Sequence, residues 1–198
     1  LTESEVNEML TMDMALEALE EVFQARSDGD VPNEPRYRLA AGKGSLNFMA
    51  ATWPKKGWAG HKSYVSGDFR VSLFGTNGEG LLAVIAAGRM GQVRTGAASG
   101  IATKYMAREN TSSVGIIGSG YQAETQLEAI CSVREIEHVK VFSRAVDRRE
   151  KFANKMSESL GVNVFPVDSK ESAAEGVDVL IAVTSSKEPV ITGEMAMP

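Results

Sequence analysis

Apolar positions in the first 30 residues recur with the period of an α-helix. Leu16, Leu19 and Phe23 fall on one face of a helix that we expect over about residues 13–24, with acidic residues outside that face. A capping-box pattern that begins at Thr2 predicts a shorter helix before it. The chain is therefore expected to begin with two amphipathic helices.

From residue 37 onward the period changes to two. Phe69, Val71 and Leu73 alternate with polar residues, which is typical of an antiparallel strand with one buried face. Gly-rich and Asn-Gly turns separate the apolar stretches, and the first turn, at residues 42–44, predicts a hairpin. The expected strands cover residues 37–41, 46–53, 58–65, 69–74 and 81–87. We predict a sheet-rich α+β domain over residues 1–110.

Strands and helices alternate in the rest of the chain. A helix rich in small residues is expected over about residues 95–108. The strands that follow are expected at 114–117, 138–142, 162–167 and 177–184, with helices at 122–132, 147–160 and 170–175. This alternation predicts an α/β domain with a doubly wound parallel sheet, a Rossmann fold, over residues 111–198.

Composition excludes several classes of partner and location. The net charge of −5 and the absence of a basic run argue against nucleic acid or an anionic membrane as the main partner. No apolar stretch approaches the roughly 18 residues of a membrane span, and the first residues lack the features of a secretory signal. The single cysteine, Cys131, is interpreted as a buried thiol and fits a reducing cytoplasm. We find no metal-ligand cluster in the sequence.

A glycine pattern, G-x-G-x-x-A, follows the apolar strand at 114–117. Its residues are Gly118, Ser119, Gly120, Tyr121, Gln122 and Ala123. Gly118 permits a tight turn, Gly120 lets the backbone approach a pyrophosphate, and Ala123 lets helix and strand pack closely. The helix that follows presents free N–H groups to an anion. An ordinary strand-to-helix turn is the alternative, but the further strand-helix units in register favour a nucleotide site.

The second strand of this domain ends at Ser143-Arg144, where an NAD site usually has a carboxylate. Arg144, with Arg148 close by, can bind a 2′-phosphate that a carboxylate would repel. We therefore predict a preference for NADP(H), with NAD(H) possible; the alternative is a solvated charge cluster at the start of a helix. Thr184 and Ser185, at the end of the fourth strand, are expected where the nicotinamide or its ribose could pass.

Three segments together resemble the ornithine cyclodeaminase/mu-crystallin family. They are residues 93–108, which contain R-T-G-A-A-S, residues 114–123 with the glycine pattern, and residues 177–186. The family includes a ketimine reductase and archaeal alanine dehydrogenase. The resemblance implies a Rossmann domain and a substrate domain whose sheet pairs across a homodimer.

The resemblance also implies that basic residues bind the substrate carboxylate. Arg36, Lys62 and Arg94 match the family positions, and Lys62 is the candidate catalytic residue, which orients the carboxylate or assists proton transfer. Lys62 is an unusual charge in the middle of a strand, and Arg94 is expected at a helix N-terminus that favours anions. The alternatives are a surface position for Arg36, a snorkelling Lys62 and a structural cap partner at Arg94. We interpret His61 as a packing residue on the opposite face of the sheet.

Two departures from the family pattern change the expectation. Asn47 stands where ornithine cyclodeaminase has a glutamate for the side-chain amine, which puts ornithine in doubt as a substrate. Family chains also continue past Pro198 into a further strand, a catalytic aspartate and a helix, so we expect the catalytic acid or base beyond this residue and an incomplete Rossmann sheet.

The leading hypothesis is an NAD(P)H-dependent oxidoreductase of amino-acid metabolism that acts on a small α-amino or α-imino acid. A cyclodeaminating lyase that releases ammonia is the first alternative, and net change in the cofactor pool separates the two. A non-catalytic nucleotide-binding protein of the crystallin type is the second.

Overall fold

The computed structural model describes residues 1–196, and Met197 and Pro198 lie outside the described residues. The chain divides into two compact units, Leu1–Arg94 and Thr95–Pro198, hereafter unit 1 and unit 2. This division differs from the predicted boundary after residue 110 and falls inside helix α3 (Gly88–Met106). The later half of α3 packs closely within unit 2, because a Cβ on Gly96 would lie 2.2 Å from the carbonyl oxygen of Thr125.

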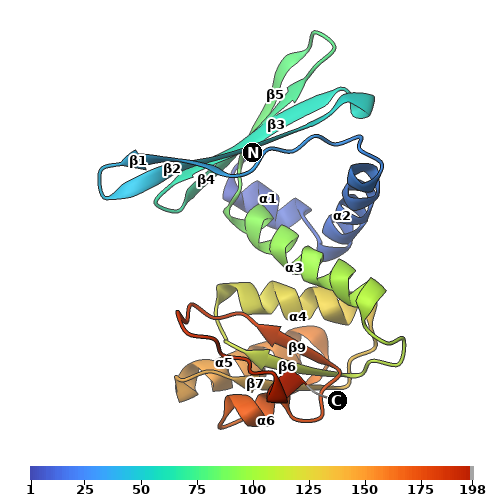
Figure 1. The fold of residues 1–198 in the computed structure, drawn as a ribbon, viewed down its shortest axis with the longest axis vertical. Helices are drawn as coiled ribbons and strands as arrows, with labels where there is room; N and C mark the ends of the chain where they lie inside the picture. The colour runs from blue at the N-terminus through green and yellow to red at the C-terminus, as the bar shows by residue number, and fades with distance from the viewer. Residues whose placement is uncertain (197–198) are drawn as a thin grey trace. The chain divides into compact units, whose positions relative to one another are not determined.

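Unit 1 contains an antiparallel sheet in the order β1-β2-β3-β4-β5 (Figure 1). Its strands are β1 (Tyr37–Ala41), β2 (Gly44–Trp53), β3 (Trp58–Val65), β4 (Asp68–Gly75) and β5 (Gly80–Ala86), with a 3-10 turn η1 (Pro54–Lys56) between β2 and β3. Each strand pairs with the next in sequence, so the register follows from the short turns. The predicted hairpin and the sheet-rich first domain are confirmed.

The two faces of this sheet differ in chemistry. On one face His61 stacks between Phe48 and Phe74, with ring centroids 4.8 and 5.9 Å apart. On the other face Lys62 lies near the ring of Phe69, with Nζ 4.7 Å from its centroid. Alternation along β3 thus separates a packing histidine from a charged lysine. We call the two sides the His61 face and the Lys62 face.

The helices of unit 1 lie to one side of the sheet in Figure 1. They are α1 (Glu3–Met9), α2 (Met12–Ser27) and the first turns of α3. The Glu3 carboxylate accepts hydrogen bonds from the backbone N–H groups of Gly88 and Arg89, at 2.6 and 3.0 Å, and these bonds hold the Glu3 pKa below its usual value.

The position of this cap shows that α3 begins earlier than the predicted start near residue 95. The helix begins at Gly88, so Arg94 lies in its second turn and not at its N-terminus. The anion that the α3 N-terminus favours is the carboxylate of Glu3. The expectation that a helix end helps Arg94 to attract a substrate is therefore wrong.

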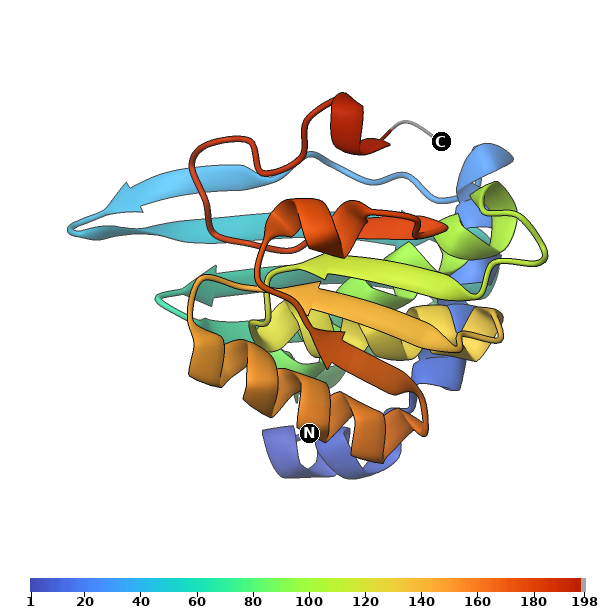
Figure 2. The ribbon, with the colours of Figure 1, turned by 90° about the horizontal axis from the view of Figure 1, so that it is seen from below.

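Unit 2 contains a parallel sheet in the order β8-β7-β6-β9 (Figure 2). The strands are β6 (Ser113–Ile117), β7 (His138–Phe142), β8 (Asn163–Pro166) and β9 (Val179–Ala182); the helices are α4 (Tyr121–Val133), α5 (Val146–Leu160) and α6 (Lys170–Ala174), with a final 3-10 turn η2 (Glu194–Ala196). The order reverses between β6 and β9, which is the switch point where doubly wound sheets bind ligands. The predicted α/β Rossmann architecture is confirmed.

The core of unit 2 forms where α4 and α5 pack on the buried strands. Val114, Ile116, Val139 and Val141 are fully buried, and Leu127 of α4 packs in the same cluster. Near-continuous apolar strands of this kind are expected when both faces of a parallel sheet are covered. Within residues 1–196, no helix combines the length and the apolar character that crossing a membrane requires.

Candidate functional site

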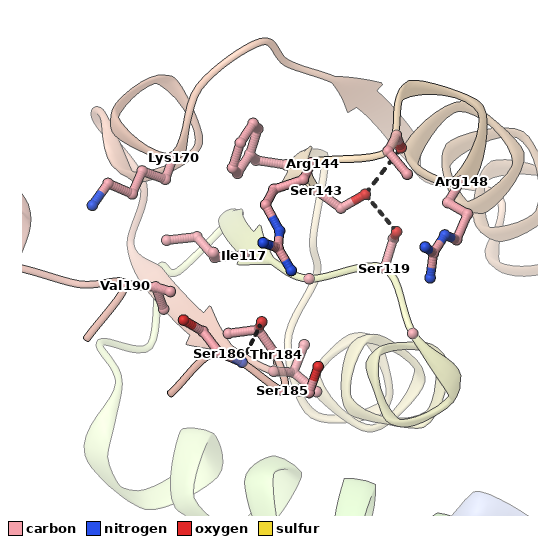
Figure 3. A pocket seen from close by; sticks show the side chains of 15 residues that line it. Ile117, Ser119, Ser143, Arg144, Arg148, Lys170, Thr184, Ser185, Ser186 and Val190 are labelled. Atoms are coloured by element: carbon pink, nitrogen blue, oxygen red, sulfur yellow. Dashed lines mark hydrogen bonds between the residues drawn. The ribbon is translucent and has the colours of Figure 1, made fainter. Parts of the chain in front are cut away.

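A cavity of about 320 Å³ opens in unit 2 beside the switch point (Figure 3). Its lining comes from the ends of β6, β7 and β9, the loops that follow them and the starts of α5 and α6. The lining residues are Ile117, Gly118, Ser119, Gly120, Phe142, Ser143, Arg144, Ala145, Arg148, Lys170, Val183, Thr184, Ser185, Ser186 and Val190. Ligands of doubly wound folds bind at this edge of the sheet.

The glycines of the turn explain why this edge is open. Gly118 has a φ of 118°, and a Cβ there would lie 2.3 Å from the carbonyl oxygen of Val183, so no other residue fits without a shift. A Cβ on Gly120 would meet nothing within 4 Å. Gly120 is the N-cap of α4 and has no side chain, so no side-chain cap covers the N-terminus of the helix. This cradle fits the pyrophosphate of a dinucleotide.

Two serine hydroxyls form a directed chain beside this cradle (Figure 3). The Ser143 hydroxyl donates to the carbonyl oxygen of Ala145 at 3.2 Å, because a carbonyl can only accept. Its single proton is then used, so the Ser119 hydroxyl must donate to Ser143, at 2.9 Å. Both hydroxyls therefore offer lone pairs, not protons, to a ligand in the cavity.

Basic side chains supply the complementary donors. Figure 3 shows Arg144 and Arg148 near Ser119, with Lys170 at the other end of the cavity. Arg149 has a different role, because it is only 9% exposed, forms an ion pair with Asp168 and donates to the carbonyl oxygen of Ser143. Arg149 fixes the loop, and the other three are available to an anion.

The structure places most of the predicted nucleotide residues on the cavity wall. Gly118, Ser119, Gly120, Ser143, Arg144, Arg148, Thr184 and Ser185 all line it. Tyr121, Gln122 and Ala123 do not. Ala123 is fully buried in the core, as close helix-strand packing requires, and Tyr121 is exposed. The sequence reasoning missed Lys170, although its position just after a parallel strand was a usable signal.

A second cavity, of about 970 Å³, lies within unit 1 between the Lys62 face of the sheet and α2. Arg36, Lys62 and Arg94 all line it, so the structure brings the three predicted carboxylate-binding residues to one cavity. Apolar side chains form much of the remaining wall. They include Leu19, Val22, Phe23, Met49, Trp53, Trp58, Val71 and Leu73.

Lys62 is the most perturbed group in this cavity. Burial lowers its pKa from 10.5, and the nearby charges of Arg94 and Arg36 lower it further. A Cβ on Gly91 would lie 2.9 Å from Nζ, so the absence of a side chain on α3 leaves room for the lysine. Within residues 1–196 no carboxylate pairs with Lys62, Arg36 or Arg94. Three cations without an acid partner form a site for an anion, and a small carboxylate fits their chemistry.

The described part of the chain contains no candidate metal-binding site. No group of three or more histidine, cysteine, aspartate or glutamate side chains is placed to hold an ion there. The two cavities are therefore the candidate sites: one suits a nucleotide and the other suits a small acid.

Comparisons with known proteins agree with this geometry. The sequence profile of the ornithine cyclodeaminase/mu-crystallin family matches residues 1–198. Alanine dehydrogenase of Archaeoglobus fulgidus is 36% identical, over 98% of this chain and 62% of that protein.

Two solved structures also have the same fold. Delta(1)-pyrroline-2-carboxylate reductase of Thermococcus litoralis, in complex with NADH and L-proline, matches with a TM-score of 0.90 and 31% identity, over 98% of this chain and 64% of that one. An archaeal alanine dehydrogenase dimer with bound NAD matches with a TM-score of 0.91 and 34% identity, over 98% and 63%. The chain thus spans less than two thirds of the length of these relatives.

Proposed function

The chain belongs to the ornithine cyclodeaminase/mu-crystallin family, and from this premise we propose that it forms part of an NAD(P)H-dependent oxidoreductase acting on a small α-amino or α-imino acid. The observation that carries the proposal is Lys62, a lysine in mid-strand beside Arg36 and Arg94, none of which pairs with a carboxylate within residues 1–196. A partly buried lysine beside two other cations costs stability when no counter-ion is present, so its retention is explained best by an anionic substrate.

The residues of unit 1 divide the work on the substrate. Arg36 and Arg94 bind the carboxylate through their guanidinium groups, and so fix the position of the neighbouring α-carbon. Lys62 contributes at Nζ, where its lowered pKa increases the neutral fraction at a given pH. A neutral amine can accept a proton from the substrate nitrogen, and the ammonium form can return it.

The unit 2 cavity is proposed to hold the cofactor, which when bound exchanges a hydride with the substrate carbon. Gly118 and Gly120 leave room for the pyrophosphate, and Arg144 and Arg148 offer charged donors to a 2′-phosphate. These arginines favour NADP(H). The lone pairs of Ser119 and Ser143 can instead accept from the ribose hydroxyls of NAD(H), so that cofactor remains compatible.

Turnover tests the proposal directly. Cyclic imines that bear a carboxylate, and 2-oxo acids supplied with ammonia, should be reduced with loss of NADPH absorbance. Lys62→Met should lower kcat/KM by about 100-fold or more, whereas Lys43→Met, the same change in the exposed β1–β2 turn, should leave it unchanged. Full activity of Lys62→Met would contradict the site.

The cyclodeaminating lyase gives a different result in the same assay. It would release ammonia with no net change in NAD(P)H, because the cofactor is reduced and reoxidised in one turnover. The structure offers one argument against ornithine: the neutral Asn47 amide is 6% exposed and already bonded to Arg38 and Ser45. A non-catalytic binding protein would bind nucleotide and show neither signal.

A homodimer is part of the proposal and rests on the His61 face of the sheet. Tyr37, Leu39, Phe48 and Val84 are large apolar side chains that remain 38–62% exposed there. The archaeal alanine dehydrogenase structure is a dimer. Light scattering should give twice the chain mass, and Phe48→Lys with Val84→Lys should give the single mass.

A cytoplasmic location stays a prediction from the cysteine content.

Cys131 is half-buried against the core of unit 2, and burial raises its thiol pKa to about 11. A thiol with so high a pKa is a poor nucleophile at neutral pH. Its role is therefore packing and not catalysis.

A further inference from the structure

The unit 1 cavity holds more positive charge than one carboxylate requires. Its basic lining residues are Arg26, Arg36, Arg38, Lys62 and Arg94, and Glu34 is its only acidic one. The carboxylate site already described accounts for three of the five cations. Like charges that share a cavity repel one another unless an anion separates them, so the excess calls for a second anionic group.

Arg38 is oriented by a hydrogen bond to a neutral side chain. Its Nε donates to Oδ1 of Asn47 at 3.1 Å. The Asn47 side chain is 6% exposed, and its Nδ2 donates to the carbonyl and hydroxyl oxygens of Ser45, both at 3.1 Å. Because Ser45 fixes which end of the amide faces Arg38, the guanidinium has a set orientation.

This arrangement leaves Arg38 with its charge and its outer N–H groups uncommitted. A neutral amide orients the guanidinium without neutralising it, and no carboxylate pairs with Arg38 within residues 1–196. An arginine keeps donors in a fixed fork that matches the two oxygens of a carboxylate. The geometry is that of a preformed acid receptor.

The sheet register separates Arg38 from the first anion site. Arg38 pairs with Asn47, which pairs with Tyr64, whereas Lys62 pairs with Met49 one row away on the same face. Two strand spacings and two residue steps place the Cα atoms of Arg38 and Lys62 roughly 12 Å apart. Both side chains are long and reach the same cavity, so they can hold the two ends of one small molecule.

We propose that Arg38 binds a second acidic group, so that the substrate is an amino or imino diacid with a carboxylate at each end. This inference rests on the proposed function, because it assumes that the first carboxylate occupies Arg36, Lys62 and Arg94. Arg38 is then the residue that determines specificity for the side chain.

Unreactive acids test the inference by binding alone, without turnover or cofactor. Succinate and glutarate serve as diacid probes and butyrate as the matched monoacid, with affinity measured by chemical-shift titration of this chain. The diacids should bind at least about tenfold more tightly than butyrate, the gain expected from one charge-assisted contact. Arg38→Gln should remove that difference while butyrate affinity stays the same.

Two further variants sharpen the test. Asn47→Asp keeps the orienting contact but pairs Arg38 with a carboxylate, so it should also remove the diacid preference. Lys43→Gln deletes a charge from the same hairpin, away from the cavity lining, and should change nothing. Because Arg38 is exposed, Arg38→Gln should fold, and circular dichroism will check that it does.

The outcomes separate this inference from the proposed function. Equal affinity for diacid and monoacid, or a diacid preference that survives Arg38→Gln, would overturn the role of Arg38. Lys62→Met should weaken binding of both acid classes. If no acid binds, or if Lys62→Met has no effect, the carboxylate site itself fails and the inference fails with it.

Discussion

The two candidate sites described above are built in opposite ways. In unit 2 one continuous turn, residues 117–120, supplies the centre of the wall, and the ends of β7 and β9 with the starts of α5 and α6 surround it. In unit 1 long side chains from α2, the segment before β1, the four strands β1 to β4 and α3 converge on one space. A continuous turn can be recognised in a sequence, whereas a convergent cluster depends on strand register.

The cavities also differ in electrostatic cost. The serine hydroxyls beside the glycine turn of the unit 2 cavity are neutral groups whose lone pairs solvent can satisfy. The unit 1 cavity holds Lys62 partly desolvated beside two arginines, an arrangement that opposes folding until an anion arrives. The unit 2 site therefore has little electrostatic cost to folding, whereas the unit 1 site lowers the stability of the folded chain because it holds a desolvated charge.

The largest effect is expected when one methyl group is added to the glycine turn of the unit 2 cavity. Gly118→Ala places a Cβ against the Val183 carbonyl at a φ of 118°, so it should destabilise unit 2 by about 2–4 kcal/mol and abolish nucleotide binding. Gly120→Ala has space for its Cβ and should keep the melting temperature while weakening NADPH binding at least about tenfold. Thermal unfolding and calorimetric titration measure the two effects. Equal stability losses in both variants would refute this account of the turn.

Adenosine nucleotides separate the arginines from the serines in the same cavity. Arg144→Gln should weaken adenosine 2′,5′-bisphosphate by about tenfold and leave AMP within about twofold, because only the former carries the 2′-phosphate. Ser119→Ala should show the reverse preference, a loss of about threefold for AMP only, since it removes an acceptor for the ribose hydroxyl. Lys151→Gln, on α5 outside the cavity lining, is the control. Parallel losses for both ligands in either variant would count against the assignment.

The smallest expected effect concerns stability and pH in unit 1. Lys62→Met removes a desolvated charge at similar volume, so the melting temperature at neutral pH should rise by roughly 1–3 °C. The advantage should be complete below the lowered pKa of folded Lys62 and should shrink as pH rises from that pKa toward 10.5. In this window the folded chain has lost a proton that the unfolded chain keeps, so the wild type gains stability. A Lys62→Met protein that melts below the wild type at every pH would show that the charge is structurally required.

Much of this molecule could be predicted from the sequence because its signals are local. The alternation around Phe69, the glycine turn at 118–120 and the apolar run before it depend on residues close together in the chain, and the strands and Rossmann helices lie where these patterns predict them. Ser143 and Arg144 could be placed at the cavity edge because the end of a parallel strand next to the switch point always lies there.

Only the tertiary structure decided where distant residues meet. Glu3, at the beginning of the chain, caps α3 more than 80 residues later. The helix therefore begins at Gly88, and Arg94 lies in its second turn and not at its end. Register alone sets Arg38 beside Asn47 and one row from Lys62. Such contacts depend on strand pairing and helix docking across many residues of chain, and neither periodicity nor composition carries that information.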